Sequence, residues 1–420
     1  MQVFKFGGAS IKNASAVRNM AELVRKHSND RLLVVVSAMG KTTNSLEEVY
    51  SLSLKNRDFD QNILDLKHYH LSILDGLPLS ANDDILNEVE NIFDQIRKDL
   101  SHGSNIIDSR ELYDKIVSKG EMLSSKIVHA YLRDTGLDCH WIDASNFIST
   151  DKTFKEAKIN WEKTQEVIAD RLPEKLGNGI VLTQGFIGGT DDGRYTTLGR
   201  EGSDFTAAIF ARCLKADSVT IWKDVSGVLN ADPKVIPDAI KFDSLNYHEA
   251  AEMTYYGASV IHPKTIKPLA NLNIPLLVKS FENPEESGTC INHMEMEKVV
   301  PSIIFKENQS LISFKVRDFT FINENNLSII FHLLDQLNIK INMMQNSAIS
   351  FSICIDNQEE KIKELLQSLR NDFEIYYNTN LKLITVKNYD QQTIDQVCNN
   401  QDILLEQKTR HNFQIVVASH

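Results

Sequence analysis

The chain has 420 residues, 42% of them hydrophobic and 24% charged, a composition typical of a globular protein with two or three domains. Its formal net charge is −12 without any block of basic residues, so we do not expect nucleic acid as a partner. No apolar run approaches the roughly 18–20 residues of a membrane span, and the five scattered cysteines predict no zinc site, so we expect a cytoplasmic protein with reduced thiols and no membrane partner.

Strand-like runs alternate with helix-like segments through the first two thirds of the chain. Residues 32–36 (LLVVV) are apolar throughout, as expected of a parallel strand covered on both faces. Apolar residues at helical spacing predict a helix over residues 14–27, and residues 58–135 predict a mostly helical, bundle-like insertion. Further buried strands are predicted at residues 3–6, 180–183, 219–222 and 274–278. The alternation predicts an α/β core with a parallel-dominated sheet, whose ligands lie beyond the carboxyl ends of the strands.

The pattern changes near residues 290–302, where we place a domain boundary. Residues 311–377 predict the order βαββαβ, with helices at 325–337 and 358–370, and a shorter second run follows with a helix at 390–398. The strands are predicted at residues 311–316, 340–345, 349–355, 373–377, 382–386, 403–406 and 413–417. We therefore divide the chain into residues 1–295, 300–378 and 379–420.

The first chemistry-bearing stretch is VFKFGGAS, residues 3–10, which also lacks the cationic start and apolar core of a secretory signal. Lys5 ends a predicted strand and is followed by Gly7, Gly8 and Ser10. Glycines let backbone amides approach an anion, and the lysine adds a full positive charge, so the stretch is typical of a phosphate site. Asn13 is placed to cap the next helix. The alternative interpretation is a tight turn after an edge strand.

The second stretch, LLVVVSAMGKTTNS, contains GKTT at residues 40–43, which resembles the end of a phosphate-binding P-loop. That motif requires glycine where Val35 stands within the strand, so a P-loop is disfavoured. The stretch instead predicts a loop whose hydroxyl groups, on Ser37, Thr42 and Thr43, are available to polar ligand atoms.

The third stretch, SKGEMLSS, places Glu121 after a glycine at the start of a predicted helix. A carboxylate in a first turn is commonly a surface partner of the helix dipole. The functional alternative is recognition of a substrate ammonium group.

The richest stretch runs over residues 183–208 and ends in TLGREGSDFTAA. Ser203 is predicted to cap a helix whose N-terminus attracts anions. Arg200 offers a bidentate fork for a carboxylate or phosphate, whereas Asp204 would be a poor phosphate contact and is better suited to orient a lysine or substrate group. The alternative is an ordinary capped helix with a surface Arg–Asp pair of little energetic value.

The last stretch, IWKDVSGVLNADPKVIPDA, leaves another predicted strand through several turns. A pocket with Lys223 and Lys234 would suit a nucleotide. The alternative interpretation is that both lysines are in solvent-exposed loops and bind no ligand.

Together these stretches resemble, in the same order, the amino-acid kinase family and specifically its aspartate kinases. KFGGAS resembles the family's KFGGTS, with Ala9 in place of threonine, and GREGSD is the most specific match. The βαββαβ pattern resembles ACT regulatory domains, which bind amino-acid effectors. The resemblance implies a three-layer sandwich around a parallel-dominated sheet, followed by α+β ACT domains, and a homodimer.

The resemblance also implies an activity: ATP-dependent phosphorylation of the β-carboxylate of L-aspartate to 4-phospho-L-aspartate and ADP, the first step toward lysine, threonine and methionine. Mg²⁺ would be held mainly by the phosphates. Implied substrate residues are Ser37, Thr43, Glu121, Arg200 and Ser203, with Glu121 on the α-ammonium and Arg200 on a carboxylate. Implied ATP-binding residues are Lys5, Gly7, Gly8, Ser10, Lys223, Asp224, Leu229 and Lys234, with Asp204 orienting Lys5.

The chain departs from the family at several of these positions. Ser259 stands where many members carry lysine, and Lys223, where threonine is common, could supply replacement charge. Leu229 and Lys234 replace a frequent tyrosine and arginine. Residues 342–348 differ from lysine-sensitive members, which argues against lysine as the effector. Two other functions stay open: a catalytically weak ACT-type amino-acid sensor, and a P-loop-like nucleotide hydrolase that depends on Lys41.

Overall fold

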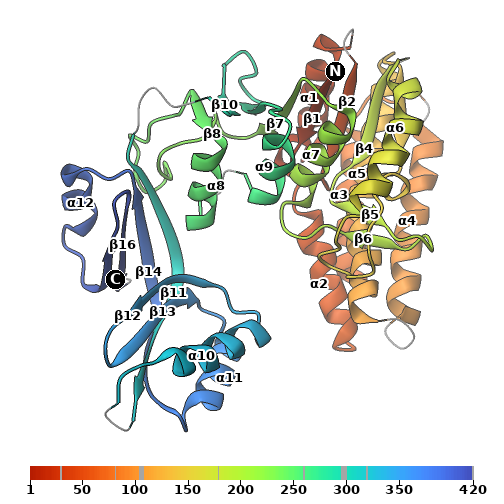
Figure 1. Cartoon of the computed structure of the whole chain (residues 1–420). Coiled ribbons are helices and arrows are strands. Elements are labelled where there is room, and N and C mark those ends of the chain that lie inside the picture. The colour runs from red at the N-terminus through yellow and green to blue at the C-terminus, as the bar shows by residue number, and fades with distance from the viewer. Residues whose placement is uncertain are drawn as a thin grey trace. The chain divides into compact units, whose positions relative to one another are not determined.

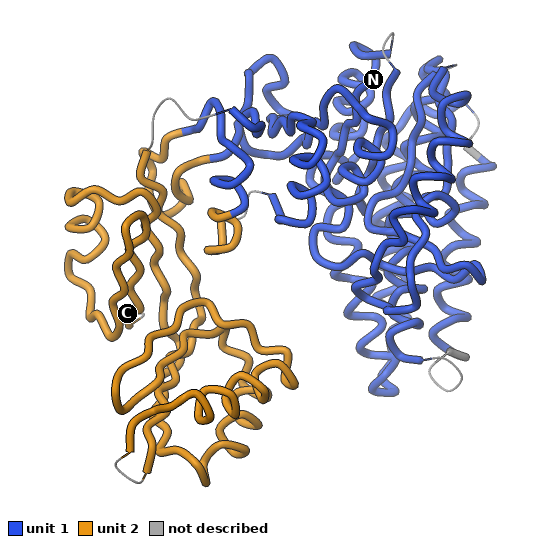
Figure 2. The backbone as a smooth tube through the Cα atoms, in the orientation of Figure 1, with its two compact units in different colours: residues 1–228, 241–251, 261–295 blue, residues 229–240, 252–260, 296–420 orange. Residues whose placement is uncertain are grey.

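The computed structural model describes residues 1–28, 31–80, 82–103, 108–177, 179–258, 261–294, 300–317 and 320–418 (Figure 1). The chain forms two compact units, coloured separately in Figure 2. Unit 1 comprises residues 1–228, 241–251 and 261–295, and unit 2 comprises residues 229–240, 252–260 and 296–420. No helix in the described part of the chain is long and apolar enough to cross a membrane.

Unit 1 is built on one mixed sheet. Among the described residues, eight strands follow the order β3-β4-β2-β1-β7-β9-β10-β8. The strands from β3 to β9 are parallel to one another, β10 is antiparallel to β9, and β8 is parallel to β10. Their bounds are β1 Gln2–Phe6, β2 Leu32–Val36, β3 Cys139–Ile142, β4 Ile180–Gln184, β7 Ser218–Lys223, β8 Ser244–Asn246, β9 Leu276–Ser280 and β10 Thr289–Asn292. The parallel-dominated sheet predicted from the apolar runs is confirmed.

Both faces of the central strands are buried, which explains their unbroken apolar sequence. Phe4, Phe6 and Val34 point to one face and pack in a core with the helices of the first half of unit 1. Val3 and Val35 point to the opposite face and are equally buried. Because side chains alternate along a strand, Lys5 must lie on the same face as Val3. This face carries α7, which packs against β1, β2 and β7.

The helical bundle predicted over residues 58–135 is present. It consists of α3 (Asp60–Asp75), α4 (Asn82–Gly103) and α5 (Ser109–Asp134), which pack with α2 (Thr42–Leu54). The predicted helix 14–27 is α1 (Ala14–Lys26), and its cap is Asn13, whose side chain accepts a hydrogen bond from the backbone N–H of Ala16. The remaining helices of unit 1 are η1 (Gly8–Ile11), η2 (Ala144–Asn146), α6 (Trp161–Gly177), α7 (Gly202–Leu214) and α9 (Pro263–Ala270).

Two short strands form a separate hairpin in unit 1. They are β5 (Ile187–Gly189) and β6 (Tyr195–Thr197), and they pair antiparallel outside the main sheet. One more helix, α8 (Tyr247–Tyr256), follows β8, and its first residues belong to unit 1 whereas its last residues belong to unit 2.

Unit 2 contains a six-stranded antiparallel sheet in the order β12-β13-β11-β14-β16-β15, as counted over the described residues. Its elements are β11 Ser302–Val316, α10 Glu324–Gln336, β12 Ile341–Asn346, β13 Ser350–Asp356, α11 Glu359–Leu369, β14 Phe373–Lys387, α12 Gln391–Cys398, β15 Ile403–Lys408 and β16 Asn412–Ala418. This is the α+β architecture that the sequence predicts.

The two predicted regulatory modules share this sheet. β11 and β14 each have 15 residues and pair with each other from Ser302↔Lys387 to Val316↔Phe373, through register shifts between Lys306 and Leu311. The division that we propose between residues 378 and 379 therefore falls inside β14.

Candidate active site

A cavity of about 910 Å³ lies in unit 1 at the carboxyl ends of the central parallel strands. Phe6, Val36 and Gln184 are paired at the last positions of β1, β2 and β4, so the loops that follow these strands meet at one edge of the sheet. The cavity is lined by residues from these loops, from α2, α5 and α7, and from two further turns: Lys5, Gly8, Ser37, Ala38, Gly40, Thr43, Asn44, Glu47, Tyr113, Glu121, Lys155, Glu156, Phe186, Gly199, Arg200, Glu201, Gly202, Ser203, Asp204 and Lys223.

Two predicted residues, Lys5 and Asp204, form an ion pair within the cavity. Their Nζ and Oδ1 atoms are 2.6 Å apart, and the two side chains are 10% and 4% exposed. Lys5 extends from β1 toward α7, and Asp204 lies in the first turn of that helix. A pair so sheltered from water is weakly screened, so the ammonium is held in one place by Asp204.

The glycines after β1 allow the backbone loops to approach closely. A Cβ atom on Gly8 would lie 2.7 Å from the carbonyl oxygens of both Ala38 and Gly40, and the N–H of Gly40 donates to the Gly8 carbonyl at 3.0 Å. A Cβ atom on Gly7 would lie 3.4 Å from Lys5 Nζ. The absence of side chains therefore brings the two loops together and leaves room beside the lysine ammonium.

The start of α7 differs from the prediction. Ser203 does not cap the helix: the helix begins at Gly202, after Glu201, which has a left-handed φ of 54° and no capping side chain. Ser203 is 8% exposed and lines the cavity. It fits there because Gly185, directly after β4, has no side chain; a Cβ atom on Gly185 would lie 2.4 Å from the Cβ atom of Ser203.

Glu121 lies in the middle of α5, so the prediction that it sits in a first helical turn is wrong. It is 3% exposed and lines the cavity. One carboxylate oxygen accepts a hydrogen bond from the backbone N–H of Ala38 at 3.4 Å, and the other, Oε2, has no hydrogen-bond partner among the described residues. Burial raises the pKa of Glu121 to about 8, against the opposing effects of that bond and of the Lys5 charge. An anionic Glu121 is therefore stabilised by a bound cation.

Arg200 occupies an exposed turn at the mouth of the cavity. It follows Gly199, which has a φ of 76°, and makes no ion pair with any described residue. Ser37 and Thr43 are half-buried and line the cavity from the loop after β2 and from the start of α2. Besides the Lys5–Asp204 pair, the cavity thus brings together the Arg200 guanidinium, the buried Glu121 carboxylate and the hydroxyl groups of Ser37, Thr43 and Ser203.

Some predicted residues do not line the cavity. The Ser10 hydroxyl is buried and donates to the carbonyl of Trp222 at 3.2 Å, which ties η1 to β7. Asp224 is exposed just beyond β7. Leu229 and Lys234 belong to unit 2, within a segment that packs on the unit 2 sheet through Ala231. Ser259 lies outside the described residues.

Only part of the GKTT stretch lines the cavity: Gly40 and Thr43 do, whereas Lys41 and Thr42 do not. Thr42 is 1% exposed, and its hydroxyl donates to the carbonyl of Met39 at 2.7 Å and contacts His70 Nε2 at 3.3 Å. The expectation that Thr42 is available to a ligand is therefore wrong, because the start of α2 turns this side chain into the helical core. Lys41 is exposed and is absent from the cavity lining.

Sequence reasoning missed Asp114 and Lys155. Asp114 is fully buried in α5, and its carboxylate accepts hydrogen bonds from the backbone of Lys155 and from the N–H and hydroxyl of Thr197. It stands seven residues before Glu121, which places both carboxylates on one face of the helix. The seven-residue spacing was the sequence signal that could have identified Asp114. Lys155 has no local signal, since only long-range contacts bring it to the cavity.

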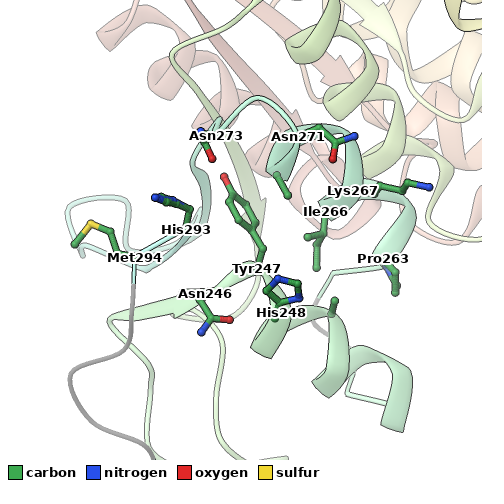
Figure 3. Close-up of a pocket in the computed structure, with 12 residues that line it drawn as sticks. Asn246, Tyr247, His248, Pro263, Ile266, Lys267, Asn271, Asn273, His293 and Met294 are labelled. Atoms are coloured by element: carbon green, nitrogen blue, oxygen red, sulfur yellow. The ribbon is translucent and has the colours of Figure 1, made fainter.

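A second cavity of about 720 Å³ lies elsewhere in unit 1, and Figure 3 shows its lining. It is lined by residues that follow β8 and β10 and by α9: Asn246, Tyr247, His248, Ala251, Pro263, Ile266, Lys267, Ala270, Asn271, Asn273, His293 and Met294. Because β8 and β10 run opposite to β1, this cavity lies at the other edge of the sheet. It contains no predicted site residue.

No cluster of three or more His, Cys, Asp or Glu side chains in the described ranges is arranged to hold a metal ion. Mg²⁺ keeps most of its waters and binds chiefly through substrate phosphates, so it requires no such cluster. The residues present therefore fit a magnesium ion that enters with a nucleotide.

Comparisons with known proteins agree on one group. The amino acid kinase family model matches residues 1–280. The lysine-sensitive aspartokinase 3 of Escherichia coli K12 is 32% identical over 355 residues, which cover 84% of this chain and 78% of that protein. The chain also matches 42% of the length of bifunctional aspartokinase/homoserine dehydrogenases of Arabidopsis thaliana.

Solved structures agree with the sequence matches. The crystal structure of E. coli aspartokinase III with aspartate and ADP, in the R-state, superposes with a TM-score of 0.86 at 27% identity and covers all of this chain and 96% of that one. The lysine- and aspartate-bound T-state of the same enzyme gives a TM-score of 0.81 at 28% identity, with the same coverage. The family match and the curated relative together establish that the chain belongs to the amino acid kinase family and, within it, to the aspartokinases.

Proposed function

We infer that the chain is an aspartate kinase, which transfers the γ-phosphoryl group of ATP to the β-carboxylate of L-aspartate and releases 4-phospho-L-aspartate and ADP. This is the first step toward lysine, threonine and methionine. The likeness to aspartokinase III in complex with aspartate and ADP supports the substrate pair. The observation that carries the assignment in this chain is the buried Lys5–Asp204 pair beside Gly8 and Glu121 in one cavity.

The chemistry requires charge neutralisation rather than a general base. The β-carboxylate of aspartate has a pKa of about 3.9 in water, so it is already an anion at neutral pH. The barrier comes from bringing this anion to a triphosphate in line for displacement. Lys5 supplies a fixed positive charge, and backbone amides after Gly7 supply further donors. Asp204 keeps the ammonium at the position of the transferring phosphoryl group.

Substrate recognition follows from the remaining charges in the cavity. Glu121 takes the α-ammonium, because its unsatisfied buried oxygen gains most from a cation. Arg200 takes a carboxylate through two parallel hydrogen bonds. Ser37, Thr43 and Ser203 contribute hydroxyl groups from the loop after β2, from α2 and from α7.

Nucleotide binding involves the loop after β1 and the end of β7. Gly7, Gly8 and Lys223 hold the phosphates, and Asp224 lies at the exposed side of this region. Bound Mg²⁺ supplies charge neutralisation of the phosphates, and no protein ligand is assigned to it. On the family resemblance, which implies a lysine in many members at the position of Ser259, we propose that Lys223 supplies the replacement charge. Ser10 supports the loop after β1 through its hydrogen bond to Trp222.

An amino-acid effector at unit 2, a homodimer and a cytoplasmic location are parts of the same proposal. The relative at 32% identity is named lysine-sensitive, and one solved aspartokinase III structure contains lysine. The differences over residues 342–348 argue against lysine here. A lysine titration of the aspartate-dependent rate separates these two expectations.

A coupled assay of ADP release, with and without aspartate, tests the function directly. An aspartate kinase releases ADP only when aspartate is present and accumulates an acyl phosphate that hydroxylamine traps. A silent amino-acid sensor releases no ADP in either case, and a P-loop-like hydrolase releases ADP without aspartate. The exposed position of Lys41 outside the cavity disfavours the hydrolase.

A further inference from the structure

Lys155 lines the same cavity as Lys5 and Arg200, although no sequence motif pointed to it. It is half-buried, and its backbone has a left-handed φ of 72°. Residues with a Cβ atom adopt this conformation only at an energetic cost, whereas glycine adopts it freely. Backbone geometry alone therefore favours glycine here, and the lysine side chain requires a separate explanation.

The strained backbone is fixed by a buried network. Both carboxylate oxygens of Asp114 accept hydrogen bonds from the Lys155 N–H at 3.0 Å. The same carboxylate accepts from the N–H of Thr197 at 2.9 Å and from its hydroxyl at 2.7 Å. The turn that carries Lys155 is thereby locked to β6, which leads directly to Gly199 and Arg200.

The Lys155 ammonium makes cation–π contacts with two tyrosine rings. Its Nζ atom lies 4.5 Å from the centroid of the Tyr113 ring and 5.6 Å from that of Tyr50. It makes no ion pair with a carboxylate of any described residue. Aromatic faces attract a cation without cancelling its charge. Lys155 thus differs from Lys5, whose ammonium is paired with Asp204 at 2.6 Å.

The turns that carry Lys155 and Arg200 touch. A Cβ atom on Gly199 would lie 3.0 Å from the Cγ atom of Glu156, which shows how closely the two turns approach. The turns that carry Lys155 and Arg200 therefore lie side by side at the cavity, and no described carboxylate forms an ion pair with either cation. Two such charges suit a carboxylate better than one.

We propose that Lys155 is a second substrate-binding cation, whose ammonium contacts the α-carboxylate of aspartate beside Arg200. The α-carboxylate stays unreacted while the β-carboxylate meets the phosphoryl group, so Lys155 contributes to substrate affinity and to the preference for a free α-carboxylate. The assignment rests on the proposed aspartate kinase activity. It explains why a lysine occupies a backbone position suited to glycine.

The test compares Lys155→Met, Lys155→Arg and Lys155→Gly with the wild type, and uses Lys158→Met as the matched control. Lys158 is exposed on the same segment and is absent from the cavity lining. In Lys155→Met we expect KM for aspartate to rise about five- to tenfold, with kcat and KM for ATP unchanged. Lys155→Arg keeps most of the affinity. Lys155→Gly loses it while its Tm stays equal to or above that of the wild type, because the strain is relieved.

Two further readouts separate substrate contact from a structural role. Calorimetric titration of aspartate into the full-length protein with ADP should show the same loss of affinity without turnover. The ratio of kcat/KM for aspartate to kcat/KM for its α-amide should also fall in Lys155→Met, by the same factor as the rise in KM for aspartate. An unchanged KM for aspartate in Lys155→Met, or an equal rise in Lys158→Met, would overturn the role of Lys155 and leave the proposed kinase function intact. Absence of aspartate-dependent ADP release in the wild type would overturn the proposed function and the assignment with it.

Discussion

The floor and the rim of the cavity carry their charges in different ways. We define the floor as Lys5, Glu121 and Asp204, which come from β1, α5 and α7 and are nearly fully buried. We define the rim as Lys155 and Arg200, which lie on turns and are half-buried and exposed. A buried charge is weakly screened and fixed by its element, whereas an exposed one is hydrated and mobile. The floor therefore suits contacts that must stay fixed, those to the phosphoryl group and to the substrate ammonium, and the rim suits substrate capture.

The comparison predicts that floor substitutions change stability together with function, whereas rim substitutions change substrate affinity and do not lower stability. Five experiments sharpen or break this distinction, and they follow from the largest expected effect to the smallest.

Lys5→Met should give the largest loss. Removing a charge aimed at the transferring phosphoryl group should lower kcat about 10²- to 10³-fold in a steady-state ADP-release assay. The variant also leaves Asp204 buried without its partner, so its Tm should fall. Lys5→Met/Asp204→Asn is the control: it should recover Tm and not kcat. Recovery of both would show that the pair is structural only.

Arg200→Ala should lower kcat/KM for aspartate by roughly ten- to a hundred-and-fifty-fold, the value of a charge-assisted bidentate bond of ~1.5–3 kcal/mol. Because Arg200 is exposed and pairs with no described residue, Tm should not change. Initial rates across aspartate concentrations, with a thermal melt of each protein, measure both. A large fall in Tm would place Arg200 among the structural residues and contradict the distinction.

Glu121 predicts a pH dependence of both stability and substrate affinity. Its pKa is raised to about 8 by burial, so the folded state favours the protonated form. The stabilisation this gives is complete below the unfolded pKa near 4.5 and is lost as pH rises through about 8. Relative to wild type, Glu121→Gln should therefore gain Tm between pH 5 and about 9. A difference in Tm that stays constant over that range would show that Glu121 does not titrate as described.

The same titration affects aspartate binding. The substrate ammonium requires the anionic carboxylate, so KM for aspartate should fall as pH rises from about 6.5 to 8, and this slope should vanish in Glu121→Gln. Initial rates at fixed saturating ATP measure it. A slope that persists in the variant would assign the titration to another group.

Lys41→Ala should have the smallest effect. Lys41 is exposed outside the cavity, so kcat and both KM values should stay within about twofold of wild type. A loss comparable to that of Lys5→Met would revive the P-loop interpretation of GKTT.

The sequence predicted regular elements better than side-chain surroundings. β2 matches its prediction, because a strand buried on both faces is apolar at every position. β9 starts two residues later than predicted, at Leu276 after Pro275, and β3 and the β5–β6 hairpin were missed because short strands carry weak signals. The sequence also did not predict that β11 and β14 are long, continuous strands. Their length depends on pairing between segments that are distant in the chain.

The candidate site was predictable where a motif carried the chemistry. Lys5, Glu121, Arg200 and Asp204 were all named from the sequence, and the fold brings them to one cavity. The local setting of Glu121 and the capping role of Ser203 were wrong, since helix boundaries depend on the left-handed Glu201 and on packing. Lys155 could not be predicted, because its position follows from a carboxylate 41 residues earlier in the chain.

A crystal structure with ADP, magnesium and aspartate tests the central claim most directly. We expect Lys5 Nζ within about 2.7–3.2 Å of a β-phosphate oxygen, and the aspartate ammonium at the same distance from Glu121. Its β-carboxylate should face the space between the ADP and Lys5. A nucleotide whose phosphates lie away from Lys5 and Gly8, with aspartate bound elsewhere, would contradict the account.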